Sequence, residues 1–291
     1  LEEHHCETVC IPCLNDDDDW ALGYAKYINV LVNSSATDIS EHFYKLDRKI
    51  ISEEIPEQIQ ESAALTPKAK TSIKLIFLTL FLDLVGFSII FPLFPSLAAH
   101  YLKVDSDNYF LQLIFNALNS FADVGGASIS GIVLFGGILG ALYSVLQFFA
   151  APVWGSLSDK YGRKPVLLVS IFGLFLSYVL WIFSGSFTLL ILARVIGGVM
   201  GGNLSVATAV VADVTDSKNR SKGMAFVGIA FALGFIFGPA LGGMLSMVDL
   251  TEYYPTSVKF GLNPFSMPAI LAAILSFINL IYIYFKFEET L

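Results

Sequence analysis

Charged residues are scarce in this sequence of 291 residues. Asp, Glu, Lys and Arg together make up 14% of it, whereas hydrophobic residues make up 55% and the mean hydropathy is +0.68. These values exclude an ordinary soluble domain and are typical of a membrane protein. No basic face with interleaved aromatic residues is present, so we expect no nucleic-acid partner. No basic segment with a short apolar run precedes the first long apolar stretch, so we expect no cleavable secretory signal.

Cysteine is also rare: Cys6, Cys10 and Cys13 all lie near the N-terminus, beside His4 and His5. Their spacing would suit a zinc site or an iron–sulfur cluster. A cluster enzyme of that type needs an enclosing α/β barrel, which this composition does not supply. We therefore favour a fragment of a disordered tail or of an upstream domain, and expect no cofactor. The apolar segments contain no nucleophile–base pair or metal cage, so we expect no enzymatic activity.

Acidic residues concentrate in residues 1–67, which predicts an acidic, mostly disordered cytoplasmic tail. Residues 68–291 contain six apolar runs, each long enough to cross a bilayer, since about 20 residues at ~1.5 Å each cover the hydrocarbon core. The sequence therefore predicts an all-α membrane protein with a bundle of six transmembrane helices. The expected spans are residues 75–98, 131–154, 166–187, 188–212, 224–248 and 267–285.

Basic residues flank these spans almost entirely at one end. The opposite end has only Lys103 and Lys259, together with several acidic residues. By the positive-inside rule, the N-terminus and the end of the sixth span lie in the cytoplasm. The basic residues on the cytoplasmic side are Lys68, Lys70, Lys74, Lys160, Arg163, Lys164, Lys218, Arg220, Lys222 and Lys286.

The first external loop is unusually long. From Asn108 to Phe121 its apolar residues recur at helical spacing, but this segment is too short and too polar to span a bilayer. We expect an amphipathic helix that lies on the outer membrane surface.

Two charges lie inside the predicted spans. Asp83 lies roughly 12 Å into the first span, where a lone carboxylate costs several kcal/mol unless it is paired, hydrated or protonated. It is therefore a candidate proton carrier, although a structural carboxylate bonded to neighbouring helices would fit the same position. Arg194 lies near the outer end of the fourth span and stays charged, so it must face a polar cavity or a partner. In a hydrocarbon core of about 30 Å, Asp83 and Arg194 lie roughly 9 Å apart along the membrane normal. We therefore expect a shared aqueous cavity rather than a direct salt bridge between them.

Glycines recur at helical spacing in the fourth and fifth spans. Small residues at such spacing allow helix backbones to approach closely. A proline within the fifth span removes a backbone donor and predicts a kink, which would suit a hinge or a seal against leaks. Tight packing alone is the alternative interpretation. The residues are Gly197, Gly198, Gly201 and Gly202 in the fourth span, and Gly228, Gly234, Gly238, Pro239, Gly242 and Gly243 in the fifth.

A charged hairpin, residues 155–165, joins the second span to the third. Gly155 and Gly162 would allow close approach and a tight turn there. Asp159 and Arg163 from this hairpin lie at the same membrane surface as Asp213, which ends the fourth span. Such an acid–base cluster would lock helix ends in one conformation and release them in another, although an isolated surface ion pair contributes little.

The hairpin resembles a known signature. Gly155 to Pro165 matches the loop motif of the major facilitator superfamily, G-x-L-x-D-[RK]-x-G-R-[RK]-P, at every specific position. The sequences around Asp83, Arg194 and Gly238 are similar to motifs of its drug:proton antiporters of the tetracycline-exporter type. The stretches that contain Gln147 and Asn203 resemble the tetracycline-transporter-like organic-anion carriers of this superfamily. The resemblance covers about residues 74–291.

This resemblance implies the N-terminal half of a twelve-helix fold, in which two six-helix bundles enclose a site at the membrane midplane. The C-terminal six-helix half is then expected as a partner. We favour a fragment of a longer product, because Leu1 is not an initiator and Leu291 falls where the family's central loop begins. The resemblance also implies roles for particular residues. These are Asp83 in proton coupling; Arg194, Asn203 and Gln147 in the cavity; Gly155, Asp159, Gly162, Arg163, Lys164 and Asp213 in a cytoplasmic gate; and Gly234, Gly238, Pro239, Gly242 and Gly243 in a hinge of the fifth helix.

The function that we expect is secondary active transport of small organic solutes, either organic anions or drug-like compounds, across a lipid bilayer. Proton-coupled antiport by alternating access is the leading hypothesis. The first alternative is a proton-independent facilitator or exchanger in which Arg194 attracts the anion. The second is a membrane receptor or scaffold that moves no solute.

Overall fold

The computed structural model describes residues 67–116, 131–217 and 219–290, and within these ranges the chain is helical, without a strand. The predicted tail lies outside the described residues, apart from its last residue, Pro67. The candidate metal ligands Cys6, Cys10 and Cys13 lie outside them as well. A further helical segment covers residues 109–116, within the predicted surface helix. The named elements are α4 (Pro67–Ser88), η1 (Phe91–Leu93), α5 (Phe94–Val104), α7 (Gly131–Tyr161), α8 (Arg163–Ile182), α9 (Phe187–Met200), α10 (Asn203–Val214), α11 (Arg220–Leu245), α12 (Leu250–Tyr253), η2 (Pro255–Phe260) and α13 (Ser266–Lys286).

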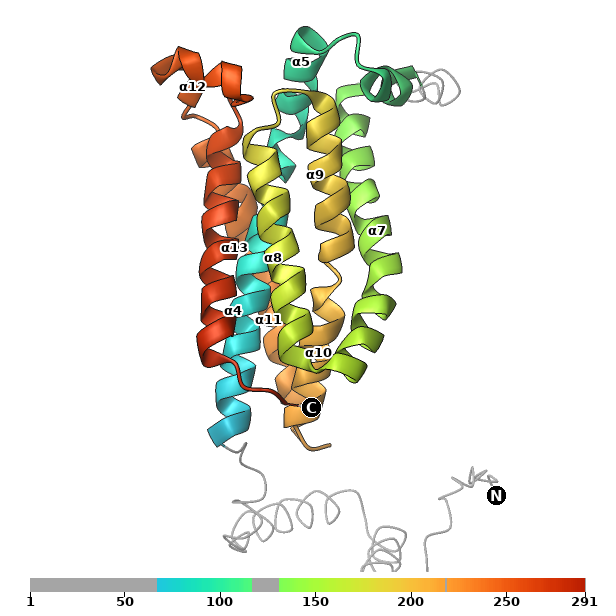
Figure 1. Ribbon diagram of the computed structural model, residues 1–291, viewed down its shortest axis with the longest axis vertical. Coiled ribbons are helices and arrows are strands. Elements are labelled where there is room, and N and C mark those ends of the chain that lie inside the picture. The colour runs from blue at the N-terminus through green and yellow to red at the C-terminus, as the bar shows by residue number, and fades with distance from the viewer. Residues whose placement is uncertain (1–66, 117–130, 218, 291) are drawn as a thin grey trace, which may run out of the picture. The chain divides into compact units, whose positions relative to one another are not determined.

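Within the described ranges, six helical segments are long and apolar enough to cross a membrane, which confirms the predicted all-α, six-span fold. In Figure 1 the long helices run side by side along the vertical axis of the bundle. We call the lower end, where α7 meets α8, the Gly162 end, and the upper end the Gly185 end. The segments are Ala69–Val104, Phe135–Tyr161, Arg163–Ile182, Phe187–Val214, Arg220–Tyr253 and Ser266–Lys286.

The first span is divided at a point that the sequence did not predict. The helix α4 continues past Asp83 as far as Ser88. The break follows at residues 89–90, just before Pro92, and Pro95 opens the next helix. Proline lacks a backbone N–H and is tolerated in the first turn of a helix, so these two prolines start new helical segments.

The fourth span is also divided, at a point that the sequence did not predict. Here α9 ends at Met200 and α10 starts at Asn203, with Gly201 and Gly202 between them. In contrast, the hairpin at residues 155–165 is almost entirely helical: α7 continues to Tyr161 and α8 starts at Arg163. The reversal of the chain is therefore confined to Gly162, whose φ of 98° favours glycine.

Two clusters of buried apolar side chains fill the bundle. The cluster towards the Gly185 end includes Trp181 and Phe187, and the cluster towards the Gly162 end includes Ile76 and Val210. Many apolar side chains nevertheless point outward from the spans, among them Phe148, which is 73% exposed. An outward apolar surface of this extent suits contact with lipid or with another bundle.

Candidate functional site

A cavity of about 220 Å³ lies inside the bundle and contacts both apolar clusters. Asp83, Gln147 and Asn203, three residues expected at the functional site, line it together. Aromatic rings form much of the remaining wall. The described lining residues are Leu80, Asp83, Leu84, Phe87, Tyr143, Ser144, Gln147, Leu174, Gly201, Asn203, Leu204, Phe231 and Phe235.

Asp83 is held by two amide side chains. Nδ2 of Asn203, the first residue of α10, donates to its Oδ2. From α13, Nδ2 of Asn279 donates to its Oδ1 at 3.0 Å. Asp83 is half-buried as a residue and lies on the wall of the cavity. Asp83 therefore joins the first, fourth and sixth spans, and both of its oxygens have a hydrogen-bond donor, as a buried polar group requires.

Arg194 lies beside the cavity but is absent from its described lining residues. Its side chain is enclosed, since the residue is only 2% exposed. The guanidinium carbon lies 4.7 Å from the ring centre of Trp181 and 6.0 Å from that of Tyr143, as in cation–π contacts. Its Nε and Nη2 are buried without a hydrogen-bond partner. In the described part of the chain no ion pair joins Arg194 to Asp83, and Tyr143, which lines the cavity, also contacts Arg194.

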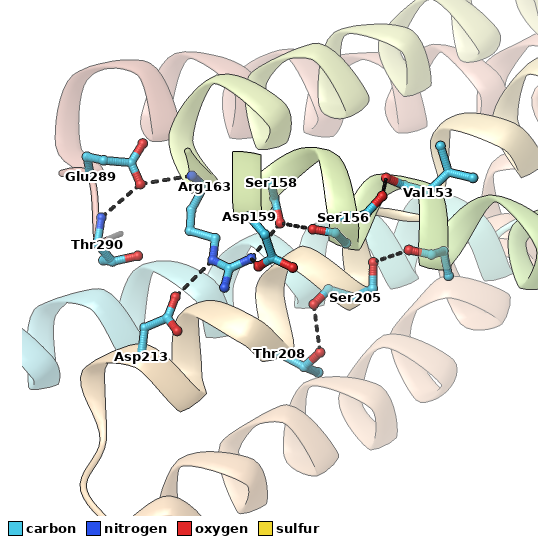
Figure 2. Close-up of polar contacts among 12 residues, drawn as sticks. Val153, Ser156, Ser158, Asp159, Arg163, Ser205, Thr208, Asp213, Glu289 and Thr290 are labelled. Atoms are coloured by element: carbon cyan, nitrogen blue, oxygen red, sulfur yellow. Dashed lines mark hydrogen bonds and ion pairs between the residues drawn. The ribbon is translucent and has the colours of Figure 1, made fainter. Parts of the chain in front are cut away.

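A second polar site lies at the Gly162 end. Arg163, which is 5% exposed, donates from Nη1 to Asp159 and to Ser158, both at 2.6 Å, and from Nε to Asp213 at 2.8 Å. Figure 2 shows the guanidinium between these partners. The sequence thus correctly placed Asp159, Arg163 and Asp213 together. Because the guanidinium is buried, this is not the weak surface ion pair that each residue would form alone.

Glu289 completes this site from the segment that follows α13. Its Oε1 accepts the main-chain N–H of Arg163 at 2.8 Å (Figure 2). Its Oε2 accepts the main-chain N–H of Lys164 at 3.1 Å. A Cβ atom at Gly162 would lie 2.6 Å from Oε2 of Glu289, so this carboxylate occupies the space that a side chain at 162 would need. We call Ser158, Asp159, Arg163, Asp213 and Glu289 the Arg163 network.

Comparison with known proteins decides the family. The profile of the Major Facilitator Superfamily matches residues 76–290 of the chain. The chain belongs to the Major Facilitator Superfamily. Members of this superfamily are transporters rather than enzymes, in agreement with the expectation from the sequence.

Individual relatives in the superfamily support the resemblance to the tetracycline-transporter type. The chain is 41% identical over 175 residues to "Major facilitator superfamily domain-containing protein 10" of Mus musculus, covering 59% of the chain and 38% of that protein. It is 36% identical over 219 residues to "Tetracycline resistance protein, class H" of Pasteurella multocida, covering 75% of the chain and 45% of that protein. The chain therefore spans less than half the length of these curated relatives.

Solved structures agree with this assignment to the superfamily. The crystal structure of the human organic anion transporter MFSD10 (TETRAN) is similar at a TM-score of 0.68 and 34% identity, covering 78% of the chain and 49% of that chain. The crystal structure of a bacterial homologue of the human lysosomal transporter Spinster is similar at a TM-score of 0.58 and 11% identity. The match covers 78% of the chain and 45% of that chain, and at this identity it shows the fold alone.

Packing divides the glycines that were noted in the fifth span into two groups. Gly234 and Gly238 face α4, because a Cβ atom at each would overlap Leu84 or Ser88. Gly242 faces the residue that follows α4, because a Cβ atom there would overlap the Ile89 carbonyl. This is the close packing that small residues permit between membrane helices. The helix continues through Pro239 to Leu245, and a Cβ atom at Gly243 would meet no atom within 4 Å. The hinge at these residues stays a prediction.

Gly155 does not have the close contact that was expected. It lies within α7, and a Cβ atom there would meet only the side chain of Ser205, at 3.8 Å, which is an ordinary contact distance. Packing within the described residues therefore does not require glycine at 155, unlike at Gly162. A part for Gly155 in a gate stays a prediction.

Among the site residues that sequence reasoning missed, two join distant segments of the chain. Asn279 contacts Asp83, and its signal was a single amide within the apolar stretch of α13. Glu289 contacts the start of α8, and the sequence patterns assigned it no role at this site. Both contacts join segments that are far apart in the chain, so local patterns give no direct indication of them.

Proposed function

We propose that the chain forms the N-terminal six-helix half of a proton-coupled secondary transporter that moves small organic solutes by alternating access. Asp83 is the observation that carries this proposal, because it is the only charged residue among the described residues that line the cavity. An ionisable group inside a membrane bundle is costly, and its usual role is in an ion or proton pathway. In this proposal the N-terminus lies in the cytoplasm, in agreement with the basic residues at the Gly162 end.

The two amides around Asp83 suit a group that exchanges a proton. When Asp83 is ionised, both oxygens accept N–H groups from Asn203 and Asn279. When Asp83 is protonated, its hydroxyl must donate to an acceptor. Oδ1 of Asn279 is buried without a hydrogen-bond partner, so a half-turn of this amide would provide that acceptor. The same pair of side chains can then stabilise both states, which supports reversible proton transfer.

The Arg163 network supports a cytoplasmic gate. It ties together the ends of α7, α8 and α10 and the segment after α13. Removing one partner of a buried ion pair costs several kcal/mol, because the other charge is left unpaired. A movement that separates these helix ends must therefore supply that energy from other contacts. We infer that the network holds one of the two conformations that alternating access requires.

A second candidate function is transport of organic anions without protons. The solved relative is titled an organic anion transporter, and Arg194 is a buried cation next to the cavity. Arg194 is not among the described residues that line the cavity, however, and it contacts Tyr143, which does line it. Attraction of an anion by Arg194 would thus need a side-chain movement, and we rank this function second.

The test is uptake of a fluorescent organic anion and of a fluorescent drug-like cation into proteoliposomes that contain the full-length protein, with and without a pH gradient. We expect uptake of at least one solute to follow the gradient in the wild type and to lose that dependence in Asp83→Asn. Ser144→Ala, on the same cavity wall, should keep it. Uptake that ignores the gradient in the wild type and persists in Asp83→Asn would refute proton coupling and favour the second function. Absence of uptake for any solute would instead favour a receptor or scaffold.

A further inference from the structure

The break in the fourth span leaves main-chain carbonyl groups without their usual partners. In a continuous helix, the carbonyl groups of Val199 and Gly201 would accept the N–H groups of Asn203 and Ser205. The N–H of Ser205 instead donates to Gly202, at 3.2 Å. Inside a membrane no bulk water is available to replace such bonds, so each freed carbonyl needs another donor.

Two side chains of α7 supply these donors. The indole Nε1 of Trp154 donates to the carbonyl of Val199 at 2.6 Å. The amide Nε2 of Gln147 donates to the carbonyl of Gly201, also at 2.6 Å. The two side chains are seven residues apart, about two helical turns, so one face of α7 reaches both carbonyl groups.

The surface of α7 is fitted closely to this break. A Cβ atom at Gly202 would overlap the indole ring of Trp154, and a Cβ atom at Gly198 would lie 2.9 Å from the main-chain oxygen of Tyr143. Glycine at these positions therefore lets α7 approach the backbone of the fourth span. The side chain of Ser205 adds a bond to the carbonyl of Ala151 at 2.8 Å.

The break determines where Asn203 points. Asn203 is the first residue of α10, and its side chain donates to Asp83. If residues 199–205 closed into a regular helix, the change in backbone dihedrals would rotate the side chains on either side of the break relative to one another, since each helical residue turns by about 100°. Asn203 and Arg194 lie on opposite sides of the break, so their relative orientation depends on it.

We propose that Trp154 is a positioning residue: by binding the Val199 carbonyl, its indole N–H keeps the fourth span broken and Asn203 directed at Asp83. Trp154 is not among the described residues that line the cavity and has no bond to the Arg163 network. It lies five residues before Asp159 on the same helix, so a movement of α7 at the gate would also act on this bond. The inference rests on the proposed proton exchange at Asp83.

The experiment uses the full-length protein and three variants. Trp154→Phe keeps an aromatic ring over Gly202 but removes the N–H donor, whereas Trp154→His retains a ring N–H. Val153→Leu, on the exposed neighbouring position, is the matched control. Hydrogen–deuterium exchange is measured for the peptide that covers residues 199–205, and solute uptake is measured as a function of pH in proteoliposomes.

In Trp154→Phe we expect exchange in this peptide to be about tenfold slower, because closure into a regular helix gives the N–H of Asn203 the Val199 carbonyl as its partner. We also expect the pH of half-maximal uptake to shift by about half a unit or more. Trp154→His should recover both values in large part, and Val153→Leu should match the wild type. Unchanged or faster exchange in Trp154→Phe would overturn the inference, as would slower exchange with an unchanged midpoint. A wild type whose uptake ignores pH would refute the proposed proton coupling itself, which is a distinct outcome.

Discussion

The carboxylate of Glu289 binds the main-chain N–H of Arg163 at 2.8 Å, although 126 residues separate them in the chain. The first N–H groups of a helix have no partner within it, and the helix dipole places partial positive charge there. Glu289 therefore caps α8 from outside, and the segment after the sixth span fixes the start of the third. The same helix start carries the guanidinium that binds Asp159 and Asp213.

Glu289→Gln is expected to lower the free energy of unfolding by about 1 kcal/mol, because a neutral amide interacts less strongly with the positive end of α8. The measurement is unfolding of the protein in mixed micelles by titration with SDS. Glu252→Gln, on an exposed acid near the Gly185 end, is the control and should unfold like the wild type. Equal losses in the two variants would contradict the capping role.

Gly162→Ala is expected to destabilise the protein by about 2 kcal/mol. At φ 98° an alanine is strained, and its Cβ atom would also displace the Glu289 carboxylate. Gly155→Ala is the matched comparison, seven residues away in α7, where a methyl group has room and alanine favours helix by up to about 1 kcal/mol. In the same unfolding titration, the free energy of unfolding should fall in Gly162→Ala and rise in Gly155→Ala. Similar effects would show that the turn does not depend on the conformation of Gly162.

Asp213→Asn is expected to cost more than Asp159→Asn. The Asp213 side chain is 26% exposed and binds a guanidinium that is 6% exposed, so its loss leaves a buried charge partly unpaired, at about 3 kcal/mol. The Asp159 side chain is 65% exposed and its contribution is below about 1 kcal/mol. Unfolding titrations of both single variants and of the double variant give the two values. A larger loss in Asp159→Asn would contradict this order.

Gly238→Ala is expected to disturb the contact between α4 and α11, since the added Cβ atom would overlap Oγ of Ser88 and approach the Val85 carbonyl. Overpacking of this kind costs about 1–3 kcal/mol. Gly243→Ala, five residues further along the same helix, has no atom within 4 Å of its Cβ position and should be neutral or slightly stabilising. Retained stability in Gly238→Ala would indicate that the two helices can separate there without loss.

Sequence patterns predicted the site residues that carry a charge within an apolar run or that belong to a contiguous motif. Asp83 and Arg194 were found because charge within an apolar run is costly, and Asp159 and Arg163 because they lie in one short hairpin. The placement of Arg194 behind Tyr143, rather than on the cavity wall, depends on the rotation of α9 against α7 and α8. That rotation is set by side-chain packing, which no single span encodes.

The sequence by itself determined that the chain crosses a membrane six times as helices, because the lengths of the apolar runs and the lack of water in lipid leave few other structures. It also placed acids and an arginine at one end of the bundle. Only the tertiary structure decided which groups satisfy one another. Asn279 and Asn203 meet at Asp83, Glu289 caps α8, and Trp154 binds a carbonyl in a broken span. These contacts join residues far apart in the chain, and they form because buried polar groups must find partners once the helices have packed.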